Sequence, residues 1–117
     1  MGWLVNDGRV LATLEVASSR SARRRGLIGR TAFDGALLLP HVRAVHTFGM
    51  RFAIDVAFVQ AEDPSADTVC AYRVLAVKGM APWRGGLPIW KADAVVEATA
   101  GAFERWCVGV GDQLEVR

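Results

Sequence analysis

The stretch FAIDVAFV, residues Phe52–Val59, holds one charged residue, Asp55, in a run that is otherwise apolar. Successive side chains of a β-strand point to opposite faces, and both faces of this stretch are apolar apart from Asp55. A strand of this kind is covered on both sides, so we expect Asp55 on a buried face. There its carboxyl must be neutral, pair with a cation or accept backbone N–H groups.

Other segments with strand patterns surround this one. Residues 3–17 predict a hairpin, because two apolar-rich arms flank Asn6-Asp7-Gly8, a sequence suited to the positive φ angles of a tight turn. Further strands are expected at residues 36–40, 68–77, 92–99 and 112–116. The pattern does not alternate regularly between strands and helices, which argues against a doubly wound parallel sheet.

Two short helices complete the expected fold. The first follows Ser18 or Ser19, either of which can cap a helix start, and Gly29 is expected to end it in the left-handed conformation. The second lies within residues 100–109. The sequence therefore predicts one α+β domain over residues 1–117, with a curled, mostly antiparallel, barrel-like sheet of six or seven short strands and two short helices.

Composition places the chain among ordinary globular domains. Its 117 residues are 52% hydrophobic and 22% charged, far from the composition of disordered chains. No long uncharged apolar stretch and no basic N-terminal leader occur, so we expect a cytoplasmic protein with no membrane segment. Cys70 and Cys107 are isolated in sequence, so we expect buried packing thiols and neither a zinc site, a redox pair nor a cofactor.

Several candidate functional residues lie where a loop meets the strand of residues 52–59. His46, Thr47 and Met50 precede Asp55 by fewer than ten residues, and functional side chains are often found at such junctions. Each also has a structural interpretation, such as a hydrogen-bonded loop residue or core packing. The argument for an interior charge applies equally to Glu97 in AVVEAT and to Arg73 in AYRVLAV.

One long irregular segment, Lys78–Trp90, contains two prolines and three glycines. Long loops in compact domains are often functional. Within it, Trp83 and Arg84 are adjacent and could stack on a flat ligand, although a tryptophan that covers the core fits the pattern as well.

Five arginines fall between residues 20 and 30 with no acid between Ser18 and Ala32. The cluster (Arg20, Arg23, Arg24, Arg25 and Arg30) could contact nucleic acid or another anionic partner, or it could be a solvated helix face. His41, His46 and Asp55 offer a weak ligand set for a metal-assisted hydrolase. Neither a nucleophile elbow nor a phosphate-binding loop is present, so catalytic residues are not identified.

Five motifs in order are similar to the bacterial and archaeal family named domain of unknown function 192, from about Arg23 to Val116. They are RRRGLIGR, HTFGMRFAIDVAFV, APWRGG, VVEATAG and GVGDQLEV. Ile28, Ala36 and Ala53 replace the family's usual Met, Met and Pro. The resemblance implies a small mixed domain with a curled antiparallel sheet and no established activity. It also implies that the family's polar positions are Arg23, His46, Thr47, Met50, Asp55, Glu97 and Asp112.

The interpretation that combines these observations is a non-catalytic domain that binds a small polar or anionic ligand. Its cleft would lie near residues 46–55 and the 78–90 loop. Nucleic-acid binding through residues 20–30 and metal-assisted hydrolysis are the alternatives. The expected ligand-binding residues are Arg23, His46, Thr47, Met50, Asp55, Trp83, Arg84 and Glu97.

Overall fold

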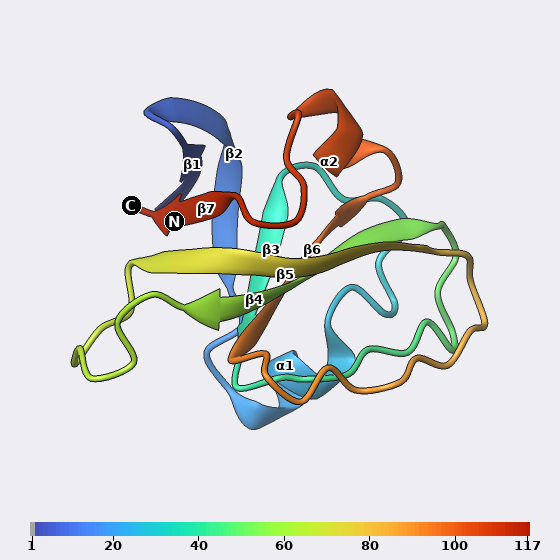
Figure 1. Ribbon diagram of the computed structural model, residues 1–117. Helices are drawn as coiled ribbons and strands as arrows, with labels where there is room; N and C mark the ends of the chain where they lie inside the picture. Colours follow the sequence, from blue (N-terminus) through green and yellow to red (C-terminus); the bar gives the residue numbers. More distant parts are fainter. Residues whose placement is uncertain (1) are drawn as a thin grey trace.

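A computed structural model describes residues 2–117, and its seven strands close into a barrel (Figure 1). The fold class and its single domain agree with the expectation. In chain order the elements are β1 (Gly2–Asn6), β2 (Arg9–Val16), α1 (Arg20–Arg25), β3 (Ala36–Pro40), β4 (Ile54–Ala61), β5 (Ala71–Met80), β6 (Ala94–Thr99), α2 (Ala102–Arg105) and β7 (Gln113–Val116).

The strand order around the barrel is β1-β2-β3-β6-β4-β5-β7, and pairing of β1 with β7 closes it. Every neighbouring pair is antiparallel except β2 and β3, which are parallel. Parallel neighbours need a crossover connection, and here α1 provides it. The expected hairpin is confirmed, because Asp7 and Gly8 between β1 and β2 both have positive φ.

Two apolar clusters cover opposite faces of the central strands. The first draws on all seven strands and on α2, so it fills the barrel interior. The second covers the outer face of β3, β6 and β4, beneath α1 and the loops after β3 and β5. In β4 the alternation is as expected: Ala57 and Val59 belong to the interior cluster, whereas Ile54, Val56 and Phe58 belong to the outer one.

Two long loops run side by side along the outer cluster. One connects β3 to β4 and the other connects β5 to β6 (Figure 1). Backbone hydrogen bonds join them at both ends of the contact, from Thr47 N–H to Arg84 O at 2.8 Å and from Ile89 N–H to Arg43 O at 2.9 Å. Together with α1, these loops cover this side of the sheet.

The structure corrects several local expectations. Helix α1 ends before Gly26, three residues earlier than expected, because Gly26 rather than Gly29 leaves the helical conformation first. Strand β5 starts at Ala71 and continues through Met80, so the irregular segment begins at Ala81. Arg73 is exposed and pairs with Glu62 at 3.0 Å, and both cysteines are exposed free thiols rather than buried ones. No helix within residues 2–117 is long and apolar enough to cross a membrane.

Candidate functional site

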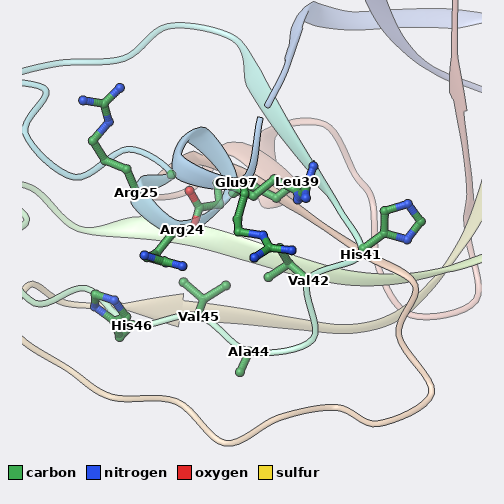
Figure 2. A pocket seen from close by; sticks show the side chains of 12 residues that line it. Arg24, Arg25, Leu39, His41, Val42, Ala44, Val45, His46 and Glu97 are labelled. Atoms are coloured by element: carbon green, nitrogen blue, oxygen red, sulfur yellow. The ribbon is translucent and has the colours of Figure 1, made fainter. Parts of the chain in front are cut away.

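A cavity of about 390 Å³ lies between α1, the segment that follows β3, and the outer face of the barrel. Figure 2 shows Glu97 beside α1, with His41 and His46 on opposite sides of the cavity and Arg24 directed between them, whereas Arg25 points away. We call this space the α1 pocket. Its lining residues are Arg20, Arg23, Arg24, Arg25, Gly26, Leu39, His41, Val42, Ala44, Val45, His46 and Glu97.

The arginines of the α1 pocket come from a short helix with no buried residue. Ser19 caps it by accepting the Ala22 N–H at 3.1 Å, and the next residues are good helix formers. Arg23 is half-buried, and the other arginines of the helix are exposed. Within residues 2–117, no arginine of α1 forms an ion pair, although Arg30, Arg73 and Arg117 each do. The helix therefore presents positive charge that the described side chains leave uncompensated.

Glu97 brings an acid to the same place. It lies on β6, opposite Leu37 of β3 and Val56 of β4, so its side chain shares the outer face with apolar neighbours. Its residue exposure is 4%, and its Oε1 atom has no hydrogen-bond partner among residues 2–117. Burial raises the pKa of Glu97 to about 7, although the Leu27 N–H and the charge of Arg30 act in the opposite direction.

Gly26 makes room for this carboxyl. A Cβ atom added at Gly26 would lie 2.6 Å from Glu97 Oε1, closer than packed atoms approach. Gly26 also has φ 54° and ψ −127°, a conformation that side chains with L chirality rarely adopt. The chain can therefore cross directly over the Glu97 carboxyl only where residue 26 lacks a side chain.

Asp55 lies away from the α1 pocket. It alternates with Ile54 and Val56, so it belongs to the interior side of β4 whereas Glu97 is on the outer side of β6. Its Oδ2 accepts the N–H groups of Gly101 at 3.1 Å and Phe103 at 3.3 Å, at the start of α2. The expected single cleft containing both His46 and Asp55 is therefore not formed, and Asp55 caps the helix that closes the barrel interior.

We expect Asp55→Ala to lower the free energy of unfolding by about 1 to 2 kcal/mol, because it removes the acceptor of two backbone donors at a helix start. Urea denaturation at pH 7 measures this loss. Asp34→Ala is the matched control, since Asp34 is exposed and forms no side-chain hydrogen bond within residues 2–117. Equal stabilities of the two variants would show that Asp55 does not cap α2.

Thr47 joins the two long loops. It is fully buried, and its hydroxyl donates to Ala81 O at 2.6 Å and accepts the Arg84 N–H at 2.8 Å. Met50 is also buried and packs in the outer cluster. Neither residue lines the α1 pocket, and their contacts hold the loops that shape it.

Trp83 and Arg84 do not form the expected platform at this site. Trp83 is 65% exposed, so it does not fill the core. Arg84 bonds back to carbonyl groups of its own loop and lines a different cavity of about 480 Å³ beside Lys78. The structure thus brings Arg23, His46 and Glu97 of the expected set together, and leaves Asp55, Trp83 and Arg84 outside the α1 pocket.

We expect Thr47→Val to lower the free energy of unfolding by about 2 kcal/mol, because the variant removes two hydrogen bonds of a fully buried hydroxyl and leaves the Arg84 N–H and the Ala81 carbonyl without this partner. Trp83→Ala, a larger truncation in the same loop region, should change it by less than about 0.5 kcal/mol. Chemical denaturation of both variants tests this ranking. A larger loss for Trp83→Ala than for Thr47→Val would mean that the Trp83 side chain packs against the protein and that the Thr47 hydrogen bonds contribute little.

A third cavity, of about 490 Å³, opens near Tyr72 and the turn after β4 and has mainly apolar walls. Residues 2–117 contain no group of three His, Cys, Asp or Glu side chains placed to hold a metal ion. His46 lines the α1 pocket whereas Asp55 caps α2, so the two residues do not form the ligand set that metal-assisted hydrolysis would require.

Residues 3–116 match the model of the family domain of unknown function 192 (DUF192), described as an uncharacterized ACR. The chain belongs to the DUF192 family. The match confirms the resemblance and extends it from Arg23 back to Trp3, so the DUF192 region includes the first hairpin. No curated protein matches the chain.

Solved structures share this DUF192 fold. A putative transcription regulator from Sinorhizobium meliloti 1021 aligns with a TM-score of 0.77 at 21% identity, over 98% of this chain and 91% of that one. A protein of unknown function from Novosphingobium aromaticivorans DSM 12444 aligns with a TM-score of 0.74 at 18% identity, over 97% of this chain and 82% of that one. At these identities the similarity establishes the fold alone.

Sequence reasoning joined only part of the α1 pocket. Arg23 was expected in one ligand site with His46 and Glu97, whereas Arg20, Arg24 and Arg25 were considered only for nucleic acid or another anionic partner, and all of these residues line one cavity. The connection depends on the crossover that carries α1 over the outer face of β6, which no local pattern reveals. His41 was considered only as a metal ligand, and the role of Gly26 beside Glu97 needed the three-dimensional structure.

Proposed function

We propose that this DUF192 domain binds a small oxyanion, such as a carboxylate or a phosphate group, in the α1 pocket. The main supporting observation is that arginines of α1 and the buried Glu97 line one cavity. Its volume of about 390 Å³ lies within the range of small-molecule sites.

The charge around the pocket supports an anion rather than a neutral ligand. Arg20, Arg23 and Arg24 line the pocket together with one buried acid, and the positive field of these arginines would raise the local concentration of anions. Guanidinium forks match the oxygen pairs of carboxylates and phosphates. His46 adds a ring whose Nδ1 accepts the Phe48 N–H at 3.3 Å, which leaves Nε2 available to a ligand.

Calorimetric titration with sulfate, phosphate and succinate tests the proposal. Arg23→Gln should weaken binding of whichever anion binds by about ten- to a hundredfold, the usual loss for a charge-assisted hydrogen bond. Arg84→Gln is the matched control, because Arg84 lines a different cavity and should leave affinity unchanged. The proposal fails if none of the three anions binds, or if Arg84→Gln weakens binding and Arg23→Gln does not.

Nucleic acid is a second candidate. The arginines of α1 favour it, as does the description of the Sinorhizobium protein as a putative transcription regulator. Contacts to several phosphates would make binding of duplex DNA fall steeply with salt. A DNA affinity that stays constant between low and moderate salt, or no DNA binding, would remove this candidate and leave the small oxyanion.

A further inference from the structure

An ionised Glu97 carboxylate would repel an anion bound in the α1 pocket. It lines the cavity that the arginines surround, and its Oε1 has no hydrogen-bond partner among residues 2–117. Two negative charges about 4 Å apart near a protein surface would weaken binding by roughly a thousandfold. A proton on Glu97 removes this repulsion and turns the carboxyl into a hydrogen-bond donor.

We propose that the oxyanion binds together with one proton, which Glu97 takes from solvent and uses to donate a hydrogen bond to the bound anion. The inference rests on the proposed function and adds the group that selects the ligand. It assigns the arginines to charge neutralisation and Glu97 to recognition of an acceptor oxygen. Ligands that present only donors to the base of the pocket, such as an ammonium group, would not profit from the proton.

The proton is available under ordinary conditions. Burial brings the pKa of Glu97 to about 7, so about half of the molecules already carry the proton at pH 7. An ordinary exposed glutamate would carry it in fewer than about 1% of molecules at that pH. Holding the proton therefore weakens the apparent affinity only about twofold at pH 7.

Other charged groups lie near Glu97, and the effect of their titration must be distinguished from that of Glu97. Helix α1 contributes Arg20, Arg23 and Arg24, whereas its Arg25 points away (Figure 2), and Arg30 follows the helix. His41 and His46 lie across the cavity (Figure 2). On the sheet, the neighbours of Glu97 are the apolar Leu37 and Val56. Because the arginines stay charged, the two histidines are the groups whose titration could imitate that of Glu97.

Titration with sulfate between pH 6 and pH 8 tests the inference, because sulfate itself does not change charge in this range. The dissociation constant of the wild-type protein should rise about tenfold from pH 6 to pH 8, as Glu97 loses its proton. A double variant, His41→Asn with His46→Gln, should keep this tenfold dependence. Glu97→Gln should lose it and should bind at pH 8 with the wild-type affinity of pH 6, because the amide donates a hydrogen bond without titrating.

Carbon-13 NMR of the wild-type carboxyl provides a second readout that needs no variant. Saturating sulfate should hold the Glu97 resonance at its protonated position above pH 7. A Glu97 resonance that shows the ionised carboxylate in the sulfate complex overturns the inference, and so does a Glu97→Gln variant that keeps the tenfold dependence. If sulfate, phosphate and succinate all fail to bind at pH 6, the proposed function fails as well. Sulfate binding that does not depend on pH contradicts only the coupled uptake of a proton.

Discussion

Gly26→Ala is expected to lower the free energy of unfolding by about 3 kcal/mol, a large effect for one methyl group. The new Cβ would lie 2.6 Å from Glu97 Oε1, and the residue would keep a backbone conformation suited to glycine. The variant must either move the end of α1 away from the barrel or displace a buried carboxyl. Chemical denaturation at pH 6 measures the loss.

Gly29→Ala is the matched control for Gly26→Ala. Gly29 also has positive φ, but a Cβ there meets nothing within 4 Å, so only the backbone strain of about 1 kcal/mol remains. In a Glu97→Ala background, Gly26→Ala should cost at least about 1 kcal/mol less, because the opposing oxygen is gone. Equal losses at positions 26 and 29, with no coupling to Glu97, would contradict the close approach of α1 to the carboxyl.

Glu97→Gln should stabilise the protein at pH 8 by about 3 kcal/mol and leave its stability unchanged at pH 4. A folded-state pKa of about 7, against 4.5 for the ordinary carboxyl, corresponds to that free energy. Below pH 4.5 both the folded and the unfolded chain carry the proton, so the group contributes no difference. Between pH 4.5 and 7 the unfolded chain loses its proton first, and stability falls as the pH rises.

Subtracting the stability of the wild-type protein from that of Glu97→Gln isolates the contribution of Glu97 to the pH dependence, because the other acids titrate equally in both proteins. Urea denaturation at half-unit steps from pH 4 to pH 8.5 gives the curve. The difference should grow through pH 5 to 7 and then remain constant. If Glu97→Gln were less stable than the wild-type protein at pH 8, the folded state would stabilise the ionised Glu97 carboxylate, contrary to this prediction.

Much of the barrel was predictable, because strand alternation and turn chemistry are local. FAIDVAFV showed that both faces of β4 are covered, and Asp7-Gly8 placed the first turn. The end of α1 was missed, since Gly26 and Gly29 both suit a helix end and the tertiary contact with Glu97 decides between them. The β5 boundary was missed because Lys78–Met80, although it contains a glycine, pairs with β4.

The candidate site was less predictable than the fold. Asp55 and Glu97 carry the same signal, one acid in an apolar strand, yet Asp55 finds two backbone donors whereas Glu97 keeps an oxygen without a partner. What separates them is the element that covers each face, α2 for Asp55 and α1 with its arginines for Glu97. That difference arises from topology and lies beyond any single segment.

Amide NMR of the labelled protein during sulfate titration at pH 6 tests the α1 pocket most directly, with sodium chloride at equal ionic strength as the reference. The largest shift changes should fall at residues 22–27 and 42–46, which border the pocket. Residues 78–87 and 64–72, which border the other two cavities, should remain unchanged. Changes confined to those segments, or none beyond the chloride reference, would contradict an oxyanion site beneath α1.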